Sequence, residues 1–178
     1  MWLNPQSWSV ISGFASKEQS DKAMQSVADI LDTPYGAKLL DPPYIDHYFD
    51  GALMHIFNPD TKENGGIFSQ SQGWLILAES LLGHGDDAFR YFEESSPASM
   101  NDKAEQRVLE PYVHGQFTES TASPYAGRSH VHWLTGTAST VMVGCVEGIC
   151  GMRPDADGLH ICPSIPAAWD GFTMEKPV

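Results

Sequence analysis

The sequence predicts a mainly α-helical protein with a short β segment near its C-terminal end. Apolar residues recur at helical spacing in several segments that begin or end at helix-capping signals. Over residues 158–163, apolar and polar residues instead alternate as in a strand. Since 42% of the 178 residues are hydrophobic, the chain has enough apolar side chains for a core.

The first predicted helix begins at Ser16. Ser16 and Gln19 have the spacing of a capping box, in which each side chain bonds to the other residue's backbone N–H. The apolar stripe of this helix consists of Ala23, Met24, Val27, Ala28 and Leu31. It should end near Thr33, because a proline follows. The stretch from there to Phe68 contains Pro42-Pro43, which excludes a regular helix and favours a long ordered loop of the kind that builds binding sites.

Two further helices are predicted in close succession, as an antiparallel pair. The second ends at Gly83 after an apolar stripe of Trp74, Leu77, Ala78, Leu81 and Leu82, and the third begins with Asp86 as its N-cap. We interpret Asp86-Asp87 and Glu93-Glu94 as solvated helix ends. Trp74 and Trp169 are expected in the core rather than beneath a sugar.

The last predicted helix runs from Thr135 to about Gly148, with Thr135 or Thr137 as its N-cap. Its free backbone N–H groups and positive dipole end suit an anion, and Gly136 would allow close approach. An ordinary capped core helix explains the same residues. Residues 155–158 are expected to form a β-turn before the strand, because a calcium loop requires a downstream Glu that is missing here.

Residues 61–70 combine an ammonium, a carboxylate, amides and two adjacent glycines. The side chains of Lys62, Glu63, Asn64 and Gln70 offer donors and acceptors suited to a sugar or a phosphate, and the glycines allow close backbone approach. The alternative is a polar turn between two ordered segments, since Asn-Gly is a common turn signal.

Other features exclude several functions. His130 and His132 have no Cys or carboxylate partner at ligand spacing, so we expect hydrogen-bonded loop histidines and no metal. Cys145, Cys150 and Cys162 are predicted to be reduced thiols. The net charge of −13 disfavours nucleic acid or an anionic membrane as a partner. No apolar run has the length of a membrane span and no signal-peptide pattern is present, so a cytoplasmic location is expected.

Four motifs resemble, in this order, those of glycoside hydrolase family 94, which contains cellobiose, cellodextrin, cellobionic acid and chitobiose phosphorylases. The motifs are Lys62–Phe68, Glu110–Val113 with Gln116, Trp133–Ser139 and Arg153–Leu159. The resemblance covers nearly the whole chain, but the chain would form only a C-terminal fragment of such an enzyme. A complementary N-terminal chain or self-association would then cover its unpartnered apolar faces.

The resemblance implies a fold and a division of the chain. Residues 1–152 would be the last helices of an (α/α)6 barrel with long active-site loops, and residues 153–178 would begin a C-terminal β segment. It also implies a reaction, the inverting phosphorolysis of a β-glucoside. A disaccharide and phosphate give a sugar 1-phosphate and a shorter sugar, while a carboxylic acid protonates the leaving oxygen. No cofactor is implied, since phosphate is a co-substrate.

The resemblance also assigns residues to subsites. Lys62, Glu63 and Gln116 match donor-sugar residues, whereas Thr135 and Gly136 match the phosphate-binding pair. No catalytic residue is assigned, because the family's general-acid Asp lies upstream of the matching positions and has no counterpart among these residues.

Two matching positions depart from the family pattern. Gln70 stands where many members have a phosphate-contacting His. Its amide can donate a hydrogen bond but cannot become cationic, so phosphate affinity should be lower or independent of imidazole protonation. Leu53 stands where cellobiose phosphorylases have an acceptor-site Glu, which argues against cellobiose as the disaccharide.

Two classes of function remain open. The chain could be part of a longer or split phosphorylase, or it could be a noncatalytic remnant that folds or binds carbohydrate without turnover. A third interpretation, a helix-hairpin interaction module, leaves the composition of residues 61–70 unexplained.

Overall fold

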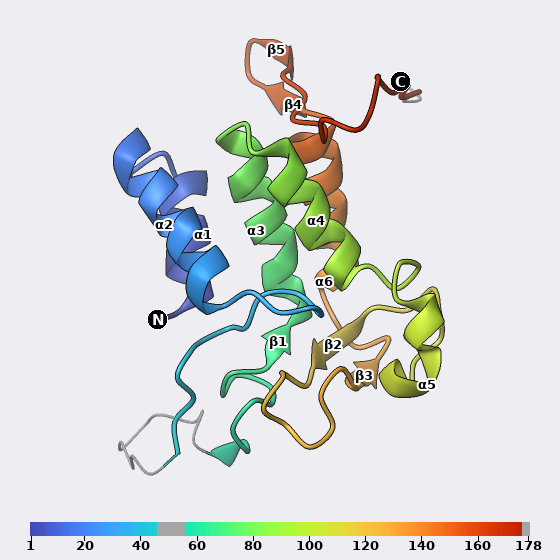
Figure 1. Ribbon diagram of the computed structural model, residues 1–178. Coiled ribbons are helices and arrows are strands. Elements are labelled where there is room, and N and C mark those ends of the chain that lie inside the picture. Colours follow the sequence, from blue (N-terminus) through green and yellow to red (C-terminus); the bar gives the residue numbers. More distant parts are fainter. Residues whose placement is uncertain (46–55, 176–178) are drawn as a thin grey trace.

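The computed structural model describes residues 1–45 and 56–175 and is mainly helical, as predicted (Figure 1). Its helices are α1 (Leu3–Ile11), α2 (Lys17–Ile30), α3 (Ser69–Leu81), α4 (Gly85–Ser95), α5 (Ala104–Arg107) and α6 (Thr137–Val143). A 3-10 turn, η2 (Asn101–Lys103), precedes α5, and α6 continues as a π-helix, η3 (Gly144–Ile149). The described residues do not close a barrel, so the (α/α)6 architecture and its boundary at residue 152 stay predictions from the resemblance.

The strands form two small antiparallel sheets. One contains β1 (Ile67–Phe68), β2 (Gly115–Thr118) and β3 (Ser129–His132) in that order. The other is the hairpin of β4 (Met152–Asp155) and β5 (Gly158–Ile161). In this hairpin Asp155 pairs with Gly158, which confirms the predicted turn and extends the predicted strand into a pair.

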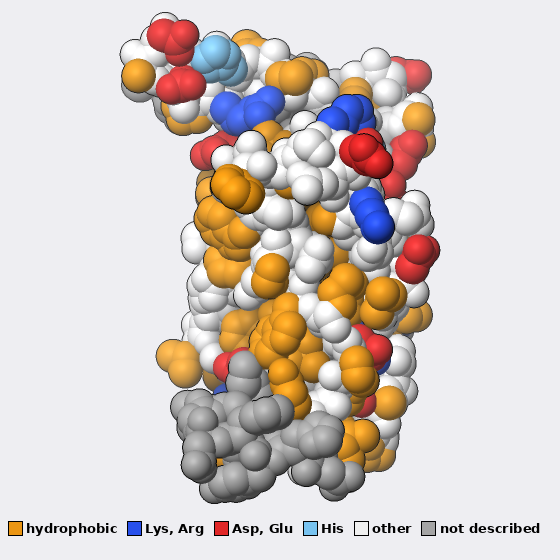
Figure 2. Space-filling model, turned by 90° about the vertical axis from the view of Figure 1, so that its left-hand side faces the viewer, with side chains coloured by type: hydrophobic (Ala, Val, Ile, Leu, Met, Phe, Trp, Pro, Cys, Tyr) orange, Lys and Arg blue, Asp and Glu red, His pale blue; other side chains and the backbone are white. Residues whose placement is uncertain are grey.

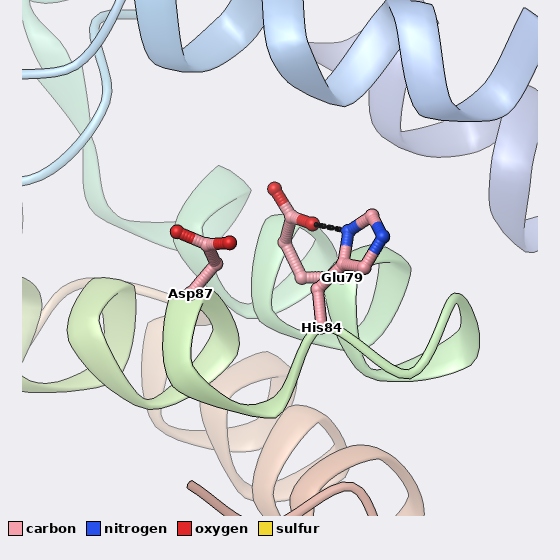
Figure 3. Close-up of side chains that lie close together, drawn as sticks. All are labelled: Glu79, His84 and Asp87. Carbon is pink, nitrogen blue, oxygen red and sulfur yellow. Dashed lines mark hydrogen bonds and ion pairs between the residues drawn. The ribbon is translucent and has the colours of Figure 1, made fainter. Parts of the chain in front are cut away.

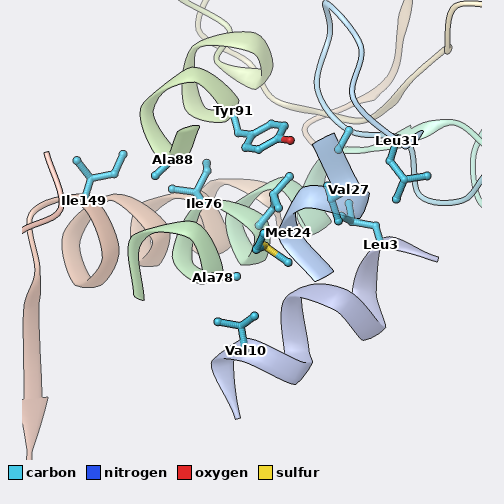
Figure 4. Packing of buried hydrophobic residues seen from close by; sticks show 12 residues of the cluster. Leu3, Val10, Met24, Val27, Leu31, Ile76, Ala78, Ala88, Tyr91 and Ile149 are labelled. Carbon is cyan, nitrogen blue, oxygen red and sulfur yellow. The ribbon is translucent and has the colours of Figure 1, made fainter. Parts of the chain in front are cut away.

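Helix α3 lies at the centre of the helical part, between α1 and α2 on one side and α4 and α6 on the other (Figure 1). Nearly every residue from Ser71 to Ser80 is buried. Around it the core contains fully buried side chains from four helices, including Leu3, Val27, Ile76 and Tyr91 (Figure 4). No helix in the described ranges is long and apolar enough to cross a membrane.

Glycines allow α3 and the α6–η3 helix to pack closely. A Cβ on Gly73 would lie 2.3 Å from the carbonyl carbon of Thr140, and one on Gly144 would lie 2.8 Å from the carbonyl oxygen of Gly73. One turn further on, a Cβ on Gly148 would lie 2.9 Å from the Ser80 hydroxyl. The two backbones therefore meet along a stripe that excludes any side chain.

Local signals predicted α2 well. Ser16 and Gln19 form the complete capping box, and the helix ends at Ile30, close to the predicted end. Helix α1 was not predicted, because its buried residues Leu3, Ser7 and Val10 include only two large apolar side chains.

The apolar stripe from Trp74 and the end at Gly83 were predicted for α3, but no start. The helix begins at Ser69, and in its polar first turn Gln72 is fully buried, with its amide bonded to both the N–H and the C=O of Ala37. Helix α3 ends at Leu81, close to the end predicted at Gly83. Gly83 has a left-handed φ of 82°.

Three predictions about α4 and its surroundings also need correction. The N-cap is His84, not Asp86, whose carboxylate instead accepts a hydrogen bond from the N–H of Ala167. Glu94 is not a solvated end, since it is partly buried and accepts a 3.0 Å hydrogen bond from Arg90. Trp169 packs against the Phe89 ring but stays 38% exposed, so it is not a core residue.

All three cysteines are free thiols. Burial raises the pKa of Cys145 to about 11, so this thiol stays protonated and unreactive at neutral pH.

Candidate functional site

The turn that contains residues 58–66 depends on Asn64. Its fully buried amide accepts a hydrogen bond from the Tyr44 N–H and donates to the carbonyl oxygens of Tyr44 and Phe57. These bonds occupy both polar atoms of the side chain and connect three separate parts of the loop. Asn64 therefore holds the turn in place, as the polar-turn alternative requires, and both polar atoms of its side chain are already bonded within the loop.

The two glycines of the turn are also required by the backbone. A Cβ on Gly66 would lie 2.5 Å from the backbone nitrogen of Lys62. Gly65 has a left-handed φ of 88°, and a Cβ on it would lie 3.1 Å from the Cβ of Pro43. The predicted alternative, a tight polar turn, thus accounts for the Asn-Gly-Gly sequence without any ligand.

Lys62 and Glu63 differ from these structural residues. Lys62 has the left-handed φ of 45°, and its ammonium lies 5.0 Å from the ring centroid of Phe57 and 6.0 Å from that of Phe117. Glu63 is partly buried, and its Oε2 is buried without a hydrogen-bond partner among the residues that the structure describes. Within the described part of the chain neither forms an ion pair, so both charges are available to a bound molecule.

Gln116 lies on β2 and precedes Phe117, and because side chains alternate across a strand it faces the other side of β2 from the Phe117 ring that Lys62 approaches. Its Oε1 is likewise buried and has no hydrogen-bond partner in the described ranges. The described residues therefore place Lys62 against the Phe117 side of β2, whereas a shared sugar subsite with Gln116 stays a prediction from the resemblance.

A carboxylate that the sequence analysis missed orients this part of the sheet. Glu119 is buried; its Oε1 lies 2.6 Å from Nε2 of His130, and its Oε2 accepts a hydrogen bond from Ser123. The His130 ring in turn stacks on Phe117 with ring centroids 4.9 Å apart. No sequence spacing signals this pair, because the partners lie on either side of the loop that joins β2 to β3.

His130 and His132 are hydrogen-bonded, as predicted, but they belong to β3 rather than to a loop. His132 Nδ1 lies 3.2 Å from a carboxylate oxygen of Glu110. His114 directly precedes β2, at the end that pairs with His132, and burial and the neighbouring Arg107 lower its pKa, so its imidazole is neutral at pH 7.

The predicted phosphate residues lie where α3 and α6 begin. The N-cap of α6 is Gly136, not Thr135 or Thr137, although the Thr135 hydroxyl accepts a 3.1 Å hydrogen bond from the Thr137 N–H. The Gln70 side-chain nitrogen lies 3.3 Å from the position that a Cβ on Gly136 would take, and Thr140 donates to the Gln70 carbonyl oxygen. The structure therefore brings Gln70 and Gly136 together.

Comparison with known families identifies the chain. The model of the glycosyl hydrolase 94 superfamily catalytic domain matches residues 1–151. The chain belongs to the glycosyl hydrolase 94 superfamily. The match includes every residue assigned above to a sugar or phosphate subsite.

Relatives within this superfamily have several names. An N,N'-diacetylchitobiose phosphorylase from Vibrio furnissii is 36% identical over 98% of this chain. A solabiose phosphorylase from Paenibacillus borealis is 31% identical over 99% of it, and a cellobionic acid phosphorylase from Neurospora crassa 34% over 99%. The chain spans 22–23% of the length of these relatives. Such similar identities to enzymes with different names select no single sugar, and Leu53, which bears on the acceptor, lies outside the described residues.

Proposed function

We propose that this chain supplies part of the donor-sugar and phosphate subsites of an inverting β-glucoside phosphorylase. The observation that carries the proposal is the contact between Gln70 and Gly136. These residues are far apart in the sequence and were assigned to one phosphate site by resemblance alone. Such a contact is expected if both bind the same anion.

The chemistry of the site agrees with this proposal. Phosphate is already a nucleophile, so the protein mainly has to orient it and offset its charge. The Gln70 amide and the backbone N–H groups at the start of α6 would donate to its oxygens. In the sugar subsite the Lys62 ammonium and the Glu63 carboxylate would form charge-assisted hydrogen bonds with hydroxyl groups, and the buried Gln116 Oε1 would accept a further one.

Exposed apolar side chains support a role within a larger assembly. Trp133, Leu134 and Met142, which lie at or near α6, are 69%, 70% and 67% exposed. Hydrophobic side chains also gather in the middle of the face drawn in Figure 2. Further parts of a phosphorylase domain, a complementary chain or a second copy would cover such surfaces.

A noncatalytic role is the second candidate. It is favoured by Gln70, which stands where many family members have a phosphate-contacting His. In that case the chain would bind sugar or phosphate without turnover.

Two assays on the purified chain test the proposal. The first measures phosphate release from α-glucose 1-phosphate with glucose, gluconate, cellobiose or N-acetylglucosamine as acceptor. We expect no turnover by the chain alone, and turnover would contradict the assignment of the acid to missing residues. The second measures binding of α-glucose 1-phosphate by calorimetry, which the proposal requires.

A matched pair of variants makes the binding assay specific. Lys62→Met should weaken binding by roughly 10- to 100-fold, the usual cost of losing a hydrogen bond to a charged group. Lys22→Met removes an exposed lysine on α2 and should change nothing. Equal affinities of the two variants, or no binding by the wild-type chain, would refute the proposed subsites.

A further inference from the structure

Away from the proposed sugar and phosphate site, three polar side chains converge where α3 turns into α4. Glu79 comes from the last turns of α3, His84 from the connection, and Asp87 from the first turn of α4 (Figure 3). Each offers one ligand atom, and these atoms all lie within 4.8 Å of one another. Neither the family resemblance nor the sequence motifs pointed to this group.

Backbone hydrogen bonds fix the arrangement. The Glu79 carbonyl oxygen accepts from the N–H groups of Leu82 and His84, at 3.1 and 3.0 Å. Gly83 supplies the left-handed φ of 82° that this tight reversal needs. His84 consequently folds back onto the helix it follows, and its Nδ1 lies 2.7 Å from Glu79 Oε2.

The Glu79 carboxylate is the least satisfied member of the group. Its side chain is only 3% exposed, and within the described part of the chain its second oxygen has no hydrogen-bond partner. Figure 3 shows that this oxygen points away from His84, toward α2. Burial raises the pKa of Glu79, while the hydrogen bond to His84 acts in the opposite direction. A buried carboxylate with an open oxygen is stabilised by a cation placed against it.

A groove gives a cation access to this oxygen. It has a volume of ≈ 400 Å³, lies between α2 and the α3–α4 turn, and includes Asp21 and Gln25 on its opposite wall. Two basic groups lie nearby. Lys17 pairs with Asp21 at 2.8 Å, and Arg90 lies 3.3 Å from one oxygen of Asp87, whose other oxygen forms no ion pair in the described ranges.

We propose that Glu79, His84 and Asp87 bind one divalent transition-metal ion of the zinc type, with water from the groove completing its coordination. One imidazole nitrogen and two carboxylate oxygens suit zinc and its neighbours, whereas calcium and magnesium prefer ligand sets made only of oxygen. The ion would connect the end of α3 to the start of α4 and offset the charge of the buried Glu79.

The chain contains an internal comparison. Asp155, Asp157 and His160 on the β4–β5 hairpin also place ligand atoms within 4.8 Å of one another, but all three residues are exposed. Flexible exposed groups of this kind are common without an ion, because water already solvates them. This hairpin group therefore serves as the control.

Titration of Zn²⁺ and Co²⁺ into the chelator-treated chain tests the proposal. We expect one tight equivalent of Zn²⁺, a rise in the melting temperature, and a Co²⁺ visible spectrum without a thiolate charge-transfer band. His84→Asn and Asp87→Asn should each weaken Zn²⁺ binding at least tenfold, since each removes a ligand. His160→Asn should leave it unchanged.

Every outcome of this titration either supports or overturns the proposed metal site. His84 and Asp87 are less buried than Glu79, so circular dichroism should verify that their variants fold. Equal Zn²⁺ affinity of wild type, His84→Asn and Asp87→Asn would overturn the proposal, as would loss of binding only in His160→Asn. A thiolate band in the Co²⁺ spectrum would assign the metal to a cysteine instead and would also overturn it.

Discussion

The helical part of the molecule differs in backbone conformation from the part that contains the long loop and the first sheet. In the described ranges, every non-glycine residue with positive φ lies between Asp60 and Trp133, and none lies within a helix. Asp60, Lys62, Val131 and Trp133 take this conformation in the loop and sheet, and Val108 takes it just after α5.

This difference indicates which part of the molecule is expected to bind a ligand. The helices are held by local hydrogen bonds and by packing around α3. The loop and sheet instead hold the left-handed residues, whereas buried side-chain oxygens without a hydrogen-bond partner in the described ranges occur in both parts, as at Ser7 and Tyr91 in the helices and at Gln116 in the sheet. Strained backbone persists only where its surroundings fix it, and it clusters at binding sites. The predictions below test this division, from the largest expected effect to the smallest.

Gly73→Ala should have the largest effect, because the new Cβ would lie 2.3 Å from the Thr140 backbone. Overpacking against backbone cannot be relieved by a rotamer change, so we expect a loss of about 3 kcal/mol or more in unfolding free energy. Urea denaturation measures it. Gly171→Ala, where a Cβ meets nothing within 4 Å, is the control and should change stability by less than about 0.5 kcal/mol. Equal effects would refute the close helix contact.

Asn64→Ala tests the opposite part of the molecule. It removes three hydrogen bonds to partly buried backbone groups of Tyr44 and Phe57, so we expect a loss of roughly 2–3 kcal/mol. Asn101→Ala, at an exposed position, is the control. A cost near zero for Asn64→Ala would mean that this turn is not held by its side chain.

The helical part also contains a pH-sensitive group. Burial, and after it the charge of Asp32, raises the pKa of Glu94 to about 7. The folded chain therefore holds this proton more tightly than the unfolded chain, and the unfolding free energy should fall as pH rises from about 4.5 to 7. Glu94→Gln should reduce that fall by roughly 1–2 kcal/mol.

Melting curves between pH 5 and 7.5 measure this effect. Glu93→Gln alters the exposed neighbour and should keep the wild-type pH profile. If Glu93→Gln and Glu94→Gln gave the same profile, burial and the charge of Asp32 would not raise the Glu94 pKa as described.

Gln70→His should have the smallest effect and tests the site directly. Imidazole at this position would be mostly cationic at pH 6 and mostly neutral at pH 8. Phosphate should therefore bind about 3- to 10-fold more tightly at pH 6 than at pH 8, whereas the wild-type site lacks this imidazole dependence. Gln106→His, on the exposed side of α5, is the control. Calorimetry at both pH values would contradict the assignment if the two variants behaved alike.

The sequence predicted the elements whose signals are local. Ser16 and Gln19 determine the start of α2 through their own hydrogen bonds, and the turn at residues 155–158 lies between two adjacent strands. The start of α3 could not be predicted, since its polar first turn is stabilised by Gln72 bonding to Ala37 in a distant loop. Strands β2 and β3 were missed because each has four residues and depends on pairing across a loop.

Site residues followed the same rule. Lys62, Glu63, Gln70 and Gln116 were assigned through motif resemblance, which depends on residue type and not on contacts, and their roles stay predictions. Glu119 was missed, because its importance arises only when the fold places it against His130.

The central claim is that Lys62, Glu63 and Gln116 form one sugar subsite with the phosphate residues Gln70, Thr135 and Gly136. Amide NMR spectra of the chain, recorded while α-glucose 1-phosphate is added, test it most directly. The claim predicts saturable shifts confined to residues 61–70, 115–118 and 134–138. Shifts confined to α1, α2 and the β4–β5 hairpin, or no shifts at saturating ligand, would contradict it.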